Sequence, residues 1–153
     1  MINISVKNKR DAVKASYHLS GKTAIISINN VADAMYPARF NHCEELVDVL
    51  SLFFDDVLRE ESGAMTKEDA VKIKDFLKKV LPNIEYLIVH CSAGVSRSAG
   101  VAAAIMKVVT GSDMGIFDNP KYRPNNHCYR TTLNELIDEE GNSIFNEHYA
   151  TKK

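Results

Sequence analysis

The nine-residue segment His90–Ser98, His-Cys-Ser-Ala-Gly-Val-Ser-Arg-Ser, is the feature that most constrains this chain. One apolar run, Tyr86–Val89, precedes the segment, and a longer one, Ala99–Met106, follows it. The first run has the length of a strand and the second that of a helix, so the segment is predicted to be a tight strand-to-helix loop. Small residues fill this loop and leave its backbone N–H groups free to turn towards one point. The sequence therefore predicts an anion-binding loop at a helix N-terminus.

Two side chains near the ends of the loop have complementary chemistry. Cys91 and Arg97 are separated by five residues. The Arg97 guanidinium can donate two hydrogen bonds to one phosphate group. Cys91 would lie beneath the phosphorus as a thiolate, because the positive field of the helix start and of Arg97 lowers its pKa. The backbone amides expected to bind the phosphate belong to Ser92, Ala93, Gly94, Val95, Ser96 and Arg97.

The loop resembles the His-Cys-x5-Arg-Ser/Thr loop of the cysteine-dependent protein tyrosine phosphatases. The residues Ala-Gly-Val-Ser-Arg-Ser within the loop most resemble those of the dual-specificity branch. The Pro124-Asn125 step is similar to the start of the helix that follows the catalytic helix in that family. The resemblance implies an α/β fold in which helices flank both faces of a central, mainly parallel sheet. The length favours a single phosphatase domain over residues 1–153.

The resemblance also implies a two-step hydrolysis of phosphomonoesters without a metal or another cofactor. Cys91 would attack phosphorus and form a phosphocysteine, which water then hydrolyses. Arg97 and the loop amides would stabilise charge on the phosphoryl oxygens. Ser98 would donate a hydrogen bond to the departing thiolate. His90 would orient the loop through hydrogen bonds to the backbone.

The general acid is expected in the pair Asp55-Asp56, directly after a predicted strand. Leu52, Phe54 and Asp56 share one face of that strand, because side chains alternate along a strand. The family places its acid in step with the inward apolar residues, which favours Asp56 and leaves Asp55 as the alternative. Two acidic residues further along the chain are weaker candidates, Asp113 and Asp118.

The substrate expected from the resemblance is a phosphorylated protein or peptide. The chain contains no glutamine, whereas the larger tyrosine-specific enzymes position water with glutamines. A compact dual-specificity type has a shallow cleft, which accepts phosphotyrosine and also phosphoserine or phosphothreonine. Ala93 and Val95 stand where phosphoinositide phosphatases often carry basic residues. The alternatives are a phosphatase of a small molecule, a phosphoinositide or an RNA 5′-phosphate, and a catalytically silent module that binds phosphorylated residues.

Charge and composition indicate the expected partners and location of the protein. The 19 basic and 20 acidic side chains give a net charge of −1, so neither nucleic acid nor a membrane is expected as a partner. Residues 1–10 lack an apolar signal core, and no apolar run approaches the length of a membrane span, so we expect a cytoplasmic monomer.

Three widely spaced cysteines, Cys43, Cys91 and Cys128, are typical of reduced thiols. Each follows a histidine, but no spacing typical of metal ligands occurs, so no metal is expected. Cys43 or Cys128 could form a reversible disulfide with Cys91, although small buried side chains are the simpler interpretation.

The remaining patterns predict the other elements. Strands are expected at Ile2–Val6, at an edge, at Thr23–Ile28, and at Leu46–Phe54, the last buried on both faces with Leu46 and Leu50 on the same side. A long loop is expected over Asn29–His42. Helices are expected at Arg10–Leu19, from the Thr66 N-cap to Pro82, after the anion loop up to Gly111, from Asn125 or Asn126 through Ile137, and at Ile144–Tyr149.

Overall fold

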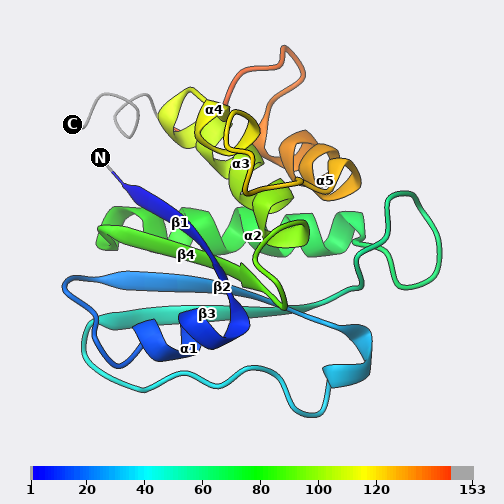
Figure 1. Ribbon diagram of the computed structural model, residues 1–153. Helices are drawn as coiled ribbons and strands as arrows, with labels where there is room; N and C mark the ends of the chain where they lie inside the picture. Colours follow the sequence, from blue (N-terminus) through cyan, green and yellow to red (C-terminus); the bar gives the residue numbers. More distant parts are fainter. Residues whose placement is uncertain (1, 146–153) are drawn as a thin grey trace.

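Four parallel strands form the central sheet of the computed structural model, which describes residues 2–145 (Figure 1). In spatial order they are β1 (Asn3–Asn8), β4 (Tyr86–Cys91), β2 (Thr23–Asn29) and β3 (Leu46–Phe53). Every neighbouring pair is parallel, so the carboxyl ends of all four strands meet at one edge of the sheet. This arrangement confirms the predicted parallel α/β fold and the predicted edge strand at the N-terminus.

The two faces of the sheet are covered unequally (Figure 1). Most helices pack on one face and enclose the main core; they are α2 (Lys67–Val80), α3 (Arg97–Thr110), α4 (Met114–Phe117) and α5 (Asn126–Leu136). The opposite face holds α1 (Lys9–Ala15), whose Ala12 packs on Ile25 and Ile88. The loop after β2, and not a helix, covers part of that second face. Phe40 of this loop packs against the same small cluster.

The start of α2 follows the predicted capping pattern. The Thr66 side chain accepts a hydrogen bond from the Asp69 backbone N–H at 3.2 Å, and the Asp69 carboxylate accepts one from the Thr66 N–H at 2.9 Å. The apolar side chains that recur along one face of α2 are buried, as expected for a helix that packs on a sheet; they are Ala70, Ile73, Phe76, Leu77 and Val80. The short 3-10 helix η2 (Leu81–Asn83) contains Pro82 and ends the segment.

β3 differs from the prediction of a fully buried strand. It lies at the edge of the sheet, and its residues are mostly half-buried. Consecutive residues of β2 pair with Leu46 and Asp48, so Val47 is an extra residue in the ladder. This bulge turns Leu46 to the α1 face beside Val49, whereas Leu50 packs on the main core. The prediction that Leu46 and Leu50 share a face is therefore wrong, because strict alternation does not hold across a bulge.

Helix ends show further differences. α1 ends at Ala15, four residues earlier than predicted, whereas α5 ends at Leu136, within one residue of the predicted end at Ile137. The segment between Gly111 and α5, for which no helix is predicted, contains the single-turn helix α4. Residues 144 and 145 are not helical, and the rest of the predicted terminal helix lies outside the described residues. Within residues 2–145, no helix combines the length and apolar character that crossing a membrane requires.

The helix that follows the anion loop is the buried centre of the molecule. Eleven of the fourteen residues of α3 are buried, and it ends at Gly111 in the left-handed conformation with φ 90°. α5 packs closely against it at Gly100, where a Cβ atom would lie 2.5 Å from the carbonyl oxygen of Asn125. Because of this close approach, the start of α5 packs against the start of α3. Asn125 therefore lies at the edge of the anion loop.

Candidate functional site

The loop between β4 and α3 holds the Cys91 thiol at its base. β4 ends at Cys91 and α3 begins at Arg97, at the carboxyl edge of the sheet (Figure 1). Cys91 is 2 % exposed. Its Sγ lies 3.0 Å from the Ser98 hydroxyl and accepts a hydrogen bond from the Ser98 backbone N–H at 3.4 Å. The thiol is thus paired with the first turn of α3, where the helix dipole is positive.

The surroundings of Cys91 favour the thiolate despite its burial. Burial opposes ionisation and by itself raises the pKa of the thiol. Hydrogen bonds from the Ser98 hydroxyl and from the Ser98 and Gly94 amides act in the opposite direction, as does the charge of Arg97. The sum lowers the pKa of Cys91 below its ordinary value of 9.0. A thiol with a lowered pKa is the form that a nucleophile requires.

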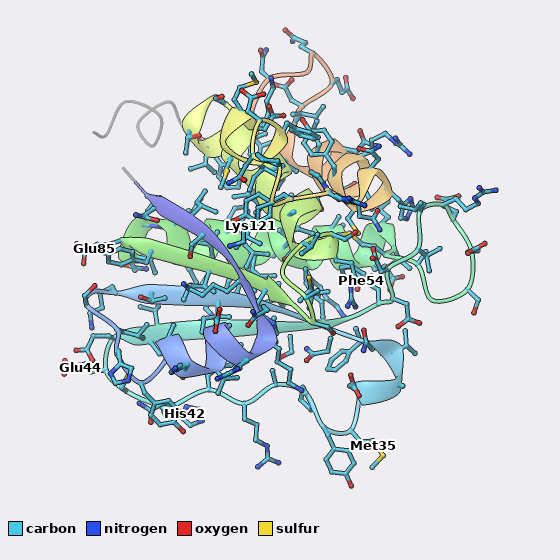
Figure 2. All side chains as sticks on the ribbon, in the orientation of Figure 1. Met35, His42, Glu44, Phe54, Glu85 and Lys121 are labelled. Carbon is cyan, nitrogen blue, oxygen red and sulfur yellow. The ribbon has the colours of Figure 1, made fainter. Side chains whose placement is uncertain are left out.

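Arg97 is held in one orientation by groups from three other segments. Its Nη1 donates to the Asn30 side-chain oxygen and to the Phe54 carbonyl, each at 2.8 Å, and its Nη2 donates to the Ser92 hydroxyl at 3.3 Å. The side chain is 6 % exposed. Figure 2 labels Phe54 near the carboxyl edge of the sheet. A guanidinium has five N–H donors, so these three bonds leave donors for an anion.

His90 supports the loop from below as a neutral ring. Its Nδ1 lies 3.3 Å from the Cys91 carbonyl oxygen, which can only accept, so Nδ1 donates. Its Nε2 therefore accepts from the Ser27 hydroxyl at 2.7 Å. Burial lowers the pKa of His90 from 6.5 to about 4. The hydrogen bond to Cys91 raises this pKa by less, and the positive charges of Lys9 and Arg97 lower it further. The predicted backbone-orienting role of His90 agrees with these contacts.

The two adjacent aspartates have different partners. The Asp56 carboxylate accepts hydrogen bonds at 2.8 Å from the Ser96 hydroxyl and from the Asn125 side-chain amide, so it lies beside the anion loop. The Asp55 carboxylate accepts from the Val31 backbone N–H at 3.0 Å. It also packs so closely on Gly63 that a Cβ there would lie 2.9 Å from it. This geometry favours the choice of Asp56 over Asp55.

Neighbouring segments fix the outer side of the loop. The Arg123 N–H donates to the Val95 carbonyl and the Asn125 N–H to the Ser96 carbonyl, both at 3.0 Å. Gly94 has φ 69°, and a Cβ there would lie 2.5 Å from the Asn8 backbone N. Glycine is therefore required at this position by both its conformation and the close approach of β1.

Two site residues were missed by the sequence analysis. Asn30, which holds Arg97, lies in a segment predicted only as a loop, and nothing local marks it. Asn125 was predicted as a helix cap, and its side chain does accept from the Cys128 N–H at 2.9 Å. Its second contact, the bond to Asp56, spans 69 positions of sequence and has no local signal.

The other two cysteines lie in different surroundings. Cys128 is fully buried, and burial together with the charge of Asp56 raises the pKa of its thiol to about 12. Cys43 is partly buried, with its Sγ 3.9 Å from the Ser16 carbonyl beyond the end of α1. All three cysteines are free thiols, so a disulfide with Cys91 stays a prediction. Within the part of the chain that the structure describes, no three His, Cys, Asp or Glu side chains gather as metal ligands would.

Comparisons with known proteins agree with this architecture. No family model matches the sequence, and no curated protein matches it. The structure is similar to the human tyrosine phosphatase-like serine/threonine/tyrosine-interacting protein, with 22% identity, a TM-score of 0.61 and coverage of 86% of this chain and 89% of that one. It is also similar to a mouse putative dual specificity phosphatase crystallised with zinc tungstate (16% identity, TM-score 0.59, coverage 86% and 80%). The structure of human DUSP28 is a third similar structure (15% identity, TM-score 0.58, coverage 86% and 90%).

The fold is therefore the α/β fold that these tyrosine phosphatase-like and dual specificity phosphatase structures share. The resemblance seen in the His90–Ser98 loop is confirmed at the level of the fold. The similar chains span nearly the same length as this one, so the shared fold covers almost all of it.

Proposed function

We propose that this chain is a single-domain, cysteine-dependent phosphatase of phosphorylated proteins, acting on phosphotyrosine and also on phosphoserine or phosphothreonine. The observation that supports it most is the pairing of a Cys91 thiol of lowered pKa with the oriented Arg97 guanidinium at one loop. The reaction requires no metal ion or other cofactor in this proposal, because the loop itself supplies the positive charge.

In the first step, the Cys91 thiolate attacks phosphorus and the bond from phosphorus to the leaving oxygen breaks. The inward-facing amides of the loop and the free N–H groups of Arg97 bind the three remaining phosphoryl oxygens. Asp56, protonated at this stage, gives its proton to the leaving oxygen and becomes a carboxylate. Its bonds to Ser96 and Asn125 place it at the rim of the loop, where a leaving group would emerge.

In the second step, water attacks the phosphocysteine and the sulfur–phosphorus bond breaks. The Asp56 carboxylate takes a proton from that water, which restores the acid and releases inorganic phosphate. The Ser98 hydroxyl, 3.0 Å from Sγ, stabilises the thiolate that departs. Each group thus returns to its starting state after one turnover.

Exposed apolar side chains on a loop connected to the site support a protein substrate. The 3-10 helix η1 (Val31–Asp33) and its continuation leave Met35 82% and Tyr36 76% exposed. Figure 2 shows Met35 on this projecting loop. The loop is attached to the site through Asn30, which binds Arg97. Apolar groups on a loop that is connected to the phosphate-binding loop through Asn30 suit a peptide better than a highly charged inositol phosphate.

The decisive test is hydrolysis of p-nitrophenyl phosphate by the wild-type protein and by Cys91→Ser. We expect wild-type turnover that a chelator does not change, and a loss of about 1,000-fold or more in Cys91→Ser, because a serine hydroxyl is not ionised at neutral pH. Cys43→Ser, which alters a thiol outside the site, serves as the control and should retain activity. A wild-type protein that binds a phosphotyrosine peptide without hydrolysing it would instead indicate a silent binding module.

A further inference from the structure

A separate cavity lies on the α1 face of the sheet, between the loop after β2 and the edge strand β3. Its volume is about 440 Å³, within the range of small-molecule sites. Its lining consists of Ala38, Arg39, Phe40, His42, Leu46 and Val49. Figure 2 labels His42 on this loop, below the sheet in that view. None of these residues belongs to the anion loop.

The lining combines an apolar base with a rim that carries the Arg39 guanidinium. Phe40, Leu46 and Val49 are partly buried and belong to the small hydrophobic cluster of this face. Arg39 and His42 are exposed. The ion pairs among residues 2–145 join Lys74 to Glu135 and Lys79 to Asp48, so Arg39 has no carboxylate partner there. A ligand with an apolar chain and one negative group matches both parts of the lining.

Two residues of the cavity wall contact the network that supports the catalytic loop. The Phe40 ring packs edge-on against the His90 ring, with centroids 5.6 Å apart. The Ala38 N–H donates to the Asn29 side-chain oxygen at 3.0 Å, and the Asn29 amide donates to the Ser27 hydroxyl at 3.2 Å.

The Phe40 ring contact and the hydrogen bonds that start at Ala38 both lead to the His90 imidazole. Ser27 donates to His90 Nε2 at 2.7 Å, and His90 in turn bonds the Cys91 carbonyl. A ligand that displaces Phe40 or Ala38 therefore changes the packing of the residue that supports the nucleophile. His90 thus contacts the cavity wall through Phe40 and the anion loop through the Cys91 carbonyl.

We propose that this cavity is a regulatory site for a small apolar carboxylate, whose binding at Arg39 and Phe40 alters turnover through His90. The regulatory part rests on the proposed phosphatase function, whereas binding itself does not. Coupling requires only that the ligand bind one arrangement of the Phe40–His90 pair more tightly than another.

The binding test is calorimetric titration with octanoate below its micelle concentration. We expect saturable binding to the wild type, no binding of acetate, and weaker binding of octanol. Arg39→Gln should weaken octanoate binding roughly threefold or more, as expected for loss of one partly exposed charge pair. The matched control is Arg130→Gln, an exposed arginine on α5, which should bind as the wild type does. Equal affinities in the two variants would overturn the proposal, and would also result if octanoate entered the anion loop instead.

A second variant and a kinetic measurement separate binding from coupling. Val49→Phe fills the cavity and should abolish octanoate binding. Saturating octanoate should change wild-type kcat/KM for p-nitrophenyl phosphate at least about twofold, with no change in Val49→Phe. Binding without any kinetic change would overturn the regulatory role. A protein that binds octanoate but hydrolyses nothing would overturn the proposed function and leave the binding site standing.

Discussion

At the scale of single residues, Asp55 and Asp56 show how adjacent identical side chains acquire different roles. Asp56 faces the anion loop through Ser96 and Asn125, whereas Asp55 ties the start of η1 to the turn at Gly63. Alternation along the end of a strand sends the two carboxylates in opposite directions. The parity argument from the sequence also selects Asp56, and its role as the general acid stays a prediction.

We predict that Asp56→Asn lowers kcat about 100-fold or more on a phosphotyrosine peptide, because the amide cannot protonate the leaving oxygen. The loss should be smaller on p-nitrophenyl phosphate, whose leaving group needs less protonation. Asp55→Asn is the matched variant, and it should lower kcat only mildly on either substrate. Steady-state kinetics of both variants on both substrates provide the measurement. The reverse ranking would make Asp55 the acid.

The Ser98 hydroxyl is the largest single contributor that lowers the Cys91 pKa. We predict that Ser98→Ala moves the midpoint of Cys91 alkylation by iodoacetamide to higher pH, because the thiolate loses its side-chain donor. Ser96→Ala is the control, since that hydroxyl donates to Asp56 instead. The rate of Cys91 modification is followed by mass spectrometry across a pH series. An unchanged midpoint in Ser98→Ala would contradict the role given to its hydroxyl.

At the scale of whole elements, α2 depends on its first turn. Thr66 and Asp69 each satisfy a backbone N–H that would otherwise lack a partner. We predict that Thr66→Ala lowers the free energy of unfolding by about 1 kcal/mol without changing kcat. Urea denaturation measures the change. Lys67→Ala, an exposed position in the same turn, is expected to change stability by less than about half that amount.

Elements with strong local signals could be predicted from the sequence, and those set by distant contacts could not. α2 and α3 follow from a capping pattern, an apolar stripe and a glycine stop, all read within a few residues. The bulge at Val47 depends on pairing with β2, which no local pattern reveals. The same division holds in the site. Cys91 and Arg97 lie within one motif, whereas Asn30 reaches Arg97 across 67 positions.

At the scale of the whole molecule, the sheet order explains why one loop collects so many contacts. β4 lies between β1 and β2, so its carboxyl end is flanked by the ends of two other strands. β1 supplies the backbone against Gly94, and β2 supplies Ser27 and Asn29 beneath His90. The anion loop is therefore supported by the sheet on one side and by α5 on the other. The stability of the fold and the shape of the site depend on the same buried contacts.

His90 makes that dependence measurable, because its pKa is about 4 in the folded protein and 6.5 ordinarily. Between these values the unfolded chain binds more protons than the folded one, so stability rises with pH across this window. The stability that neutral His90 contributes is fully present above pH 6.5 and is lost as pH falls towards 4. The free energy of unfolding changes by on the order of 3 kcal/mol in all.

We predict that the free energy of unfolding, measured in urea from pH 7 to pH 4.5, falls more steeply in the wild type than in His90→Asn. The variant has a lower stability at pH 7 but lacks the group that must stay unprotonated, so its slope is reduced. His42→Asn, which changes an exposed histidine, should keep the wild-type slope. Parallel pH profiles for the wild type and His90→Asn would show that His90 takes up its proton equally in the folded and the unfolded protein, so that burial does not lower its pKa. At acidic pH the folded protein would then hold an imidazolium, which could not accept the Ser27 hydrogen bond.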